Sequence, residues 1–99
     1  MGGIIMVLTI RFIGSLRASS KKTKLMLKLK KAVPLKEVIK IIVEEQPKLK
    51  RVLIDPELGD PRTNTIMLVN GKDISVLKGL ETMLNDGDEV VFVPVVHGG

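Results

Sequence analysis

Residues 85–99 read NDGDEVVFVPVVHGG, and the fold can be inferred by working outward from them. NDGDE has the composition of a tight turn, and the valine-rich run over 89–96 predicts a strand. Pro94 lacks the N–H that a strand interior needs, so the strand should end or leave the sheet there. Only His97 separates it from Gly98-Gly99. The ending is therefore either a frayed stub or a carboxylate that does the molecule's work.

Two alternating segments near the start of the chain predict a hairpin. In 6–12 (MVLTIRF), Leu8, Ile10 and Phe12 share one face, and in 22–30 (KTKLMLKLK) leucines alternate mainly with lysines. Such alternation is typical of half-buried strands. The short connection between the two segments favours an antiparallel pair.

One helix is expected next, from Pro34, a favoured first helical residue, to about Glu45, because Pro47 follows. Its apolar residues recur at helical spacing. They are Leu35, Val38, Ile39 and Ile42. Residues 48–64, rich in Pro, Gly and Asp, predict a long connection containing a short turn. That turn is expected to pack one or more of Leu49, Val52 and Leu53.

TIMLV (65–69) predicts a third strand, and the following Asn70-Gly71 is the strongest short hairpin signal. A strand stub, a short helical turn with a crossover, and the 89–96 strand complete the order β-β-α-β-β-β. Strands grouped around one helix indicate an α+β domain with the helix on one face of the sheet. The length of the chain favours a single domain over residues 1–99.

The composition of the chain excludes several kinds of functional site. The chain is 44% hydrophobic, has no cysteine and has one histidine, which excludes thiolate and histidine-based metal sites. No apolar run approaches the ~20 residues that span a bilayer. We expect a cytoplasmic protein without a membrane partner. Met6 could be the native start, and residues 1–5 would then be a leader.

Strand phase also predicts a docking surface. If Val90 and Phe92 face the helix, then Val91 and Val93 face away from it. By the same phase, Ile66 and Leu68 of the third strand point outward. An apolar stripe on the open side of the sheet is a candidate docking patch, although loops or a second copy could cover it.

The lysine row of the 22–30 strand has two interpretations. Lysines at every second position could track a nucleic-acid backbone, in keeping with the net charge of +5. Alternatively, these lysines could protect the edge of the sheet from pairing with another chain. Nucleic acid is the weaker interpretation, because two Phe with no Tyr or Trp leave almost no base-stacking platform.

The motifs MLVNGKDI (67–74), LNDGDEVVFVPVV (84–96) and HGG (97–99) together resemble the ubiquitin-like sulfur carriers of the MoaD/ThiS family and the ubiquitin-related modifier. The resemblance covers residues 6–99. It implies the β-grasp fold, a five-stranded mixed sheet packed on one long helix. The molybdopterin-synthase small subunit usually ends in a Pro-Pro-Val-Ala-Gly-Gly type of tail, whereas PVVHGG and FIGSL (12–16) are closer to the modifier.

The resemblance also implies a role for the tail. A separate adenylating enzyme, using ATP and Mg²⁺, would activate the Gly99 carboxylate, and this chain would bind no cofactor and be no enzyme. Sulfur would then give a thiocarboxylate for molybdopterin synthesis or transfer-RNA thiolation, with a molybdopterin-synthase large subunit or a thiolation enzyme as partner. Alternatively, a target lysine would give an isopeptide bond. Gly98 would supply clearance in a narrow channel, since glycine has no Cβ, and His97 would be a spacer.

Overall fold

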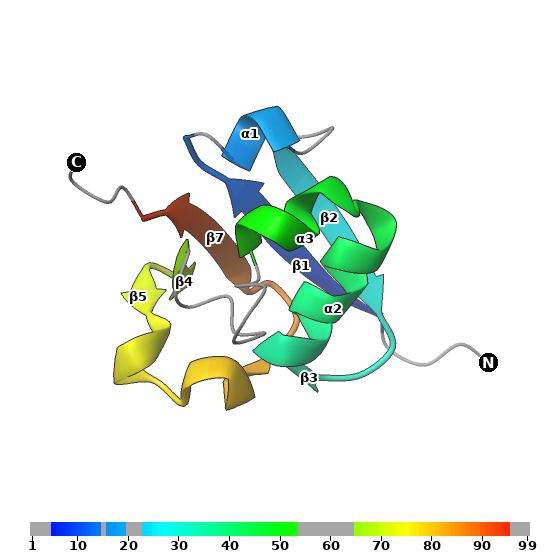
Figure 1. Ribbon diagram of the computed structural model, residues 1–99. Helices are drawn as coiled ribbons and strands as arrows, with labels where there is room; N and C mark the ends of the chain where they lie inside the picture. Colours follow the sequence, from blue (N-terminus) through cyan, green and yellow to red (C-terminus); the bar gives the residue numbers. More distant parts are fainter. Residues whose placement is uncertain (1–4, 15, 20–22, 54–64, 96–99) are drawn as a thin grey trace.

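The computed structural model describes residues 5–14, 16–19, 23–53 and 65–95 of the chain (Figure 1). Its strands are β1 (Met6–Phe12), β2 (Lys24–Leu29), β3 (Val33–Pro34), β4 (Thr65–Val69), β5 (Lys72–Asp73), β6 (Met83–Leu84) and β7 (Glu89–Pro94). Its helices are α1 (Leu16–Ser19), α2 (Leu35–Glu45) and α3 (Lys48–Leu53), and the 3-10 turns are η2 (Ile74–Val76) and η3 (Gly79–Glu81).

The main sheet has five strands in the order β2-β1-β7-β4-β5. The central pair, β1 and β7, runs parallel, and the other neighbours are antiparallel. Helices α2 and α3 lie across one face of this mixed sheet, and α1 lies at the end of β1 (Figure 1). The predicted α+β, β-grasp architecture is therefore confirmed, and β2 occupies the sheet edge as expected.

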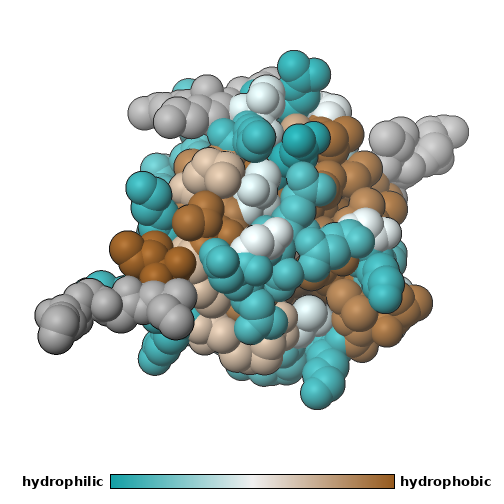
Figure 2. Space-filling view, turned by 180° about the vertical axis from the view of Figure 1, so that it is seen from behind, coloured by the Kyte–Doolittle hydropathy of each residue, from teal (hydrophilic) through white to brown (hydrophobic). Residues whose placement is uncertain are grey.

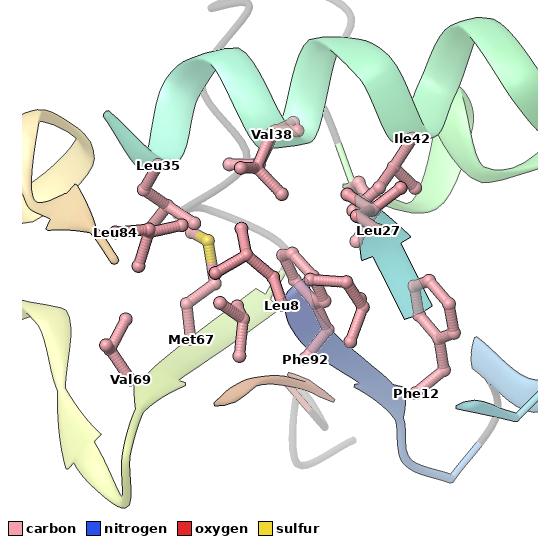
Figure 3. Packing of buried hydrophobic residues seen from close by; sticks show 14 of the residues in the cluster. Leu8, Phe12, Leu27, Leu35, Val38, Ile42, Met67, Val69, Leu84 and Phe92 are labelled. Carbon is pink, nitrogen blue, oxygen red and sulfur yellow. The ribbon is translucent and has the colours of Figure 1, made fainter. Parts of the chain in front are cut away.

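The core lies between α2 and the sheet (Figure 3). Helix α2 buries one face, as its apolar spacing predicts, against inward side chains such as Leu8, Met67 and Phe92. The rings of Phe12 and Phe92 stack with their centroids 5.7 Å apart. The strand phase assigned to β1, β4 and β7 is confirmed, because the predicted inward residues of these strands are all buried. On β2, Leu27 is buried but Leu29 is only half-buried.

Several short elements were not predicted. Helices α1 and α3 formed where a loop and a turn were expected, because Leu16, Leu49 and Leu53 are buried in the core. Tertiary packing of this kind stabilises helices too short to persist alone. Strands β3 and β6 pair in a small second sheet. Pro34 belongs to β3, so α2 begins one residue later than predicted.

Candidate docking face and C-terminal strand

The four predicted docking residues meet on the face of the main sheet opposite α2, here called the open face. Ile66 is directly opposite Val93, and Leu68 is directly opposite Val91, in the antiparallel pairing of β4 with β7. Ile66 is 42% exposed, and the other three side chains are half-buried. These four residues are called the apolar patch. Side chains opposite one another on one sheet face touch, so the patch is continuous across two strands.

The other half of the open face, over β1 and β2, is more polar, although Met26 is 50% exposed there. Along one row, Lys24 of β2 is opposite Arg11 of β1, Arg11 is opposite Val91, and Val91 is opposite Leu68. Figure 2 looks at this face and shows hydrophobic surface (brown) mainly towards one side, with hydrophilic side chains (teal) across the middle. The face therefore changes from basic to apolar between the neighbouring strands β1 and β7.

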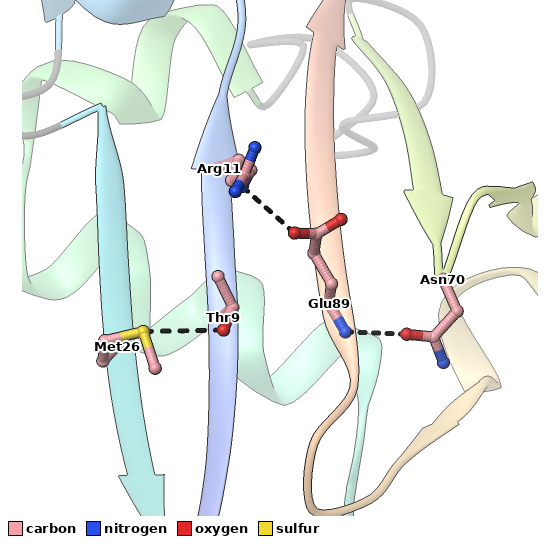
Figure 4. A network of polar contacts seen from close by, with 5 residues as sticks. All are labelled: Thr9, Arg11, Met26, Asn70 and Glu89. Atoms are coloured by element: carbon pink, nitrogen blue, oxygen red, sulfur yellow. Dashed lines mark hydrogen bonds and ion pairs between the residues drawn. The ribbon is translucent and has the colours of Figure 1, made fainter.

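One ion pair and one weak hydrogen bond lie on this polar half (Figure 4). Arg11 Nε is 3.0 Å from Glu89 Oε2, and both side chains are well exposed. The Thr9 hydroxyl donates to the sulfur of Met26 at 3.5 Å. An exposed pair such as Arg11–Glu89 contributes little to stability, because water and salt screen it. Its main consequence is that the Glu89 carboxylate already contacts one nitrogen, Nε, of the Arg11 guanidinium.

The start of β7 is fixed by the Asn70-Gly71 hairpin turn. Asn70 Oδ1 accepts from the Glu89 N–H at 2.9 Å, and its Nδ2 donates to Asp88 Oδ1 at 2.9 Å. Asn70 and Gly71 have φ values of 51° and 83°, which asparagine and glycine tolerate best. The side chain of Asn70 therefore ties the β4–β5 turn to the turn before β7.

The turn before β7 also holds β1. Asp88 Oδ2 accepts from the Asn85 N–H at 2.7 Å, which closes the turn on itself. Asp86 Oδ1 accepts from the Val7 N–H at 2.8 Å, and the Gly87 N–H donates to the Val7 carbonyl at 3.0 Å. Gly87 has a φ of 86°. The start of β7 is thus bonded to both of its neighbours, which fixes the direction in which the strand runs.

The far end of β7 lies beside Gly14, the residue at which β1 turns into α1. Gly14 has a φ of 62°, and a Cβ placed on it would come within 3.2 Å of Pro94 Cγ. Glycine suits this backbone conformation best, and any side chain here would also require Pro94 to shift by a few tenths of an ångström. Beyond Val95 the chain leaves the described residues, so the predicted reacting residue Gly99, Gly98 and His97 lie outside them.

One pKa shift is notable. Lys36 Nζ on α2 donates to Glu81 Oε1 of η3 at 2.6 Å. This hydrogen bond, together with the negative charge of Glu81, raises the pKa of Lys36 above its ordinary value of 10.5. The Lys36–Glu81 pair therefore links α2 to η3. Neither element contributes a residue to the apolar patch, so we assign this pair no role in docking.

Within the described ranges, no cluster of His, Cys, Asp and Glu side chains is suited to a metal ion. None of the helices there is long and apolar enough to cross a membrane. Sequence reasoning identified the apolar patch and the lysine row of β2, but it did not place these cations beside the patch on one face. Part of the signal was present, since alternation in β1 gives Arg11 the same outward direction as Thr9.

Comparison with known proteins places these features in context. The model of the ThiS family matches residues 10–99. Ubiquitin-related modifier 1 of Schizosaccharomyces pombe is 49% identical over 41 residues, which are 41% of this chain and 42% of that protein. The matched part thus spans about two-fifths of the curated relative's length.

Two solved structures extend the similarity over nearly the whole chain. Small archaeal modifier protein 1 from Methanosarcina acetivorans is 28% identical, with a TM-score of 0.79, and the match covers 98% of this chain and 100% of that one. A structure of the complex of subunits 1 and 2 of molybdopterin-converting factor from Helicobacter pylori contains a chain that is 28% identical. That match has a TM-score of 0.60 and covers 95% of this chain and 100% of the other.

Proposed function

This chain belongs to the ThiS family of ubiquitin-like sulfur carriers and modifiers, and we propose that it is a sulfur carrier activated at its C-terminal Gly99. The observation that carries the proposal is the joining of two features in β7. The strand contributes half of the apolar patch, and the sequence that follows it ends in Gly98-Gly99. A partner that covers the patch would therefore receive the C-terminal segment as well.

The chemistry proposed for Gly99 conserves its atoms. One carboxylate oxygen attacks the α-phosphorus of ATP, and pyrophosphate leaves, so that Gly99 becomes an acyl-adenylate. Hydrosulfide, or an equivalent sulfur donor held by a partner, then attacks the acyl carbon and expels AMP, leaving a thiocarboxylate. ATP, Mg²⁺ and the sulfur source belong to the adenylating enzyme and its associates. This chain is a carrier protein rather than an enzyme, and cytoplasmic location is part of the proposal.

The thiocarboxylate would donate sulfur to molybdopterin synthesis or to transfer-RNA thiolation. A molybdopterin-synthase large subunit or a thiolation enzyme would then be the second partner. The relative solved from Helicobacter pylori is itself in a complex of two subunits of molybdopterin-converting factor, which supports a protein partner for this chain.

A modifier function is the second candidate. The S. pombe relative is a ubiquitin-related modifier, and the His-Gly-Gly ending also favours this class. In that case a lysine amine on a target, rather than sulfur, displaces AMP from Gly99 and forms an isopeptide bond. An RNA-binding module is a third and more distant candidate, supported by the lysine row of β2 and the net charge of +5.

The experiment that tests Gly99 is ATP–pyrophosphate exchange with the adenylating enzyme of the same organism. Deleting Gly99, or adding one residue after it, should abolish exchange because the carboxylate moves by ~3.3–3.6 Å along an extended chain. A displacement of about 1 Å can already cost about 10²-fold in rate. Gly98→Val keeps the carboxylate in place but should also fail, because its side chain must enter a channel sized for backbone.

The matched control is a thermal melt of each variant, which should be nearly unchanged because the deleted residue follows the last core strand. Normal exchange by the Gly99 deletion would refute the carrier proposal. Intact mass separates the two candidates: an oxygen-to-sulfur exchange on the free chain indicates the carrier, and a covalent conjugate with a second protein indicates the modifier.

A further inference from the structure

A basic recess lies next to the apolar patch. It has a volume of about 340 Å³, and its lining includes Arg11 at the end of β1, Arg17 of α1, and Thr23 and Lys24 at the start of β2. Gly14 lines it too, so the recess reaches the place where β7 leaves the sheet. Arg17 and Lys24 are exposed, and no Asp or Glu is among its lining residues. Figure 2 shows the hydrophilic surface of this side continuing into the hydrophobic one.

The charges of the recess are not balanced within the described part of the chain. Arg11 and Lys24 are directly opposite each other in the β1–β2 register, and like charges in that position repel. Glu89 pairs with Arg11 through Nε, and a guanidinium carries five N–H donors, so Arg11 can bind a further acceptor. The lining thus holds three cations and no carboxylate of its own. An anion brought by a partner would relieve this repulsion.

The neighbouring surface indicates which class of anion enters the recess. Arg11 is directly opposite Val91, and Val91 is opposite Leu68, so the recess and the apolar patch form one surface. Both phenylalanines are buried and stack on each other, and the chain has no Tyr or Trp. In the part of the chain that the structure describes, a nucleic acid would thus find no exposed aromatic ring for base stacking. A protein surface with an apolar centre and carboxylates at one side fits both halves.

We propose that the partner docking on the apolar patch inserts a cluster of Asp and Glu side chains into the basic recess beside it. This inference rests on the proposed function, because the partner it concerns is the adenylating enzyme. The apolar patch would form the dry centre of the interface, and the recess its charged rim. Rim charges of this kind mainly accelerate association and select the partner. The recess would thereby orient the chain so that the end of β7 points into the enzyme.

The test is binding of the full-length chain to the adenylating enzyme of the same organism, with Lys24→Glu compared with Lys28→Glu. Both lysines are exposed on β2 and point to the open face, and both substitutions change the net charge equally. Lys28, however, is opposite Val7 and does not line the recess. Lys28→Glu therefore controls for net charge. Arg17→Glu is a second recess variant, located on a different element.

At low ionic strength, about 0.01 M, Lys24→Glu and Arg17→Glu should each weaken binding by about threefold to tenfold, mostly through a slower association rate. Lys28→Glu should weaken it less than about twofold. At about 1 M salt, where the Debye length is about 3 Å, the variants should bind like the wild type. Equal losses for Lys24→Glu and Lys28→Glu, or no loss for either recess variant, would overturn the inference.

Two further measurements separate this inference from its rivals. Labelled polyuridine RNA should not compete with the enzyme at moderate salt, and competition lost in Lys24→Glu would assign the recess to RNA instead. Pyrophosphate exchange should be normal in Lys28→Glu, which does not line the recess. If the wild type supports exchange but the recess variants bind normally, only this inference fails. If the wild type supports no exchange, the proposed function fails, and this inference fails with it.

Discussion

The two faces of the main sheet are both apolar along β7, but they differ in what covers them. Phe92 is 0% exposed beneath α2, while its neighbours Val91 and Val93 are half-buried on the open face. A strand that is hydrophobic on both sides is expected in a sheet covered on both sides. Within the described ranges, helices cover one face only. The covered face therefore provides stability, and we expect the open face to receive the proposed partner.

The largest effect should come from the covered face. Phe92→Ala removes a ring that stacks on Phe12 and contacts the core, so it should lower the free energy of unfolding by about 3–5 kcal/mol. Val91→Ala, one residue away on the open face, should cost about 1 kcal/mol or less. Denaturant unfolding measures both. Similar losses of unfolding free energy for the two variants would contradict the view that the covered face provides most of the stability.

The next effect should come from the open face. Leu68→Asp or Val91→Asp would leave a charge without a partner in a desolvated interface, and should weaken binding to the adenylating enzyme by about 2 kcal/mol or more. Isothermal titration calorimetry measures this loss. The fold should remain intact, as circular dichroism would show, because neither side chain belongs to the buried core.

Val76→Asp is the matched control for these open-face variants. Val76 is 72% exposed, in η2, and is outside the apolar patch, so the same kind of charge placed there should leave binding unchanged. Equal weakening by Val76→Asp would locate the docking surface at η2 rather than on the open face. Sedimentation of the wild type tests the other alternative, in which a second copy covers the apolar patch.

Most of this two-faced arrangement was predictable from the sequence, because strand side chains alternate with a period of two. That period assigned Ile66 and Leu68 to one side and Met67 and Val69 to the other, as the structure has them. The short elements were not predictable. Leu16 in α1 forms part of a helical turn only because the core buries it, and no local pattern carries that information.

Hydrogen bonds between side chains that are distant in the sequence could not be predicted either. Asn70 and Asp88 are 18 positions apart, and each was read only as a residue of its own turn. Nothing in either turn shows that their side chains would meet, since this depends on the pairing of β4 with β7. The basic recess has the same origin, because α1 and the β1–β2 pairing bring its cations together. Long-range placement of polar side chains is therefore what sequence reasoning lacked.

A smaller loss of stability should follow from disrupting the Asn70-Gly71 turn between β4 and β5. Asn70→Ala removes two side-chain hydrogen bonds and places alanine at a φ of 51°. It should cost about 1–2 kcal/mol of unfolding free energy. Asn70→Gly loses the same bonds but suits the backbone, so it should cost less. Thermal or urea unfolding of both variants separates the two causes, and identical costs would show that backbone strain is unimportant there.

The smallest effect should come from the outer side of α2, where Lys36 pairs with Glu81. Because this pair is exposed, Lys36→Gln should barely change the melting temperature at pH 7. The pKa of Lys36 is raised in the folded state, so what stability the pair adds is fully present below the ordinary pKa of 10.5 and is lost as the pH rises through the raised one. The small difference between the melting curves of the wild type and the variant should therefore disappear only in strongly alkaline buffer. A large difference at pH 7 would mean that this exposed pair holds η3 against α2, and that stability is not confined to the covered face of the sheet.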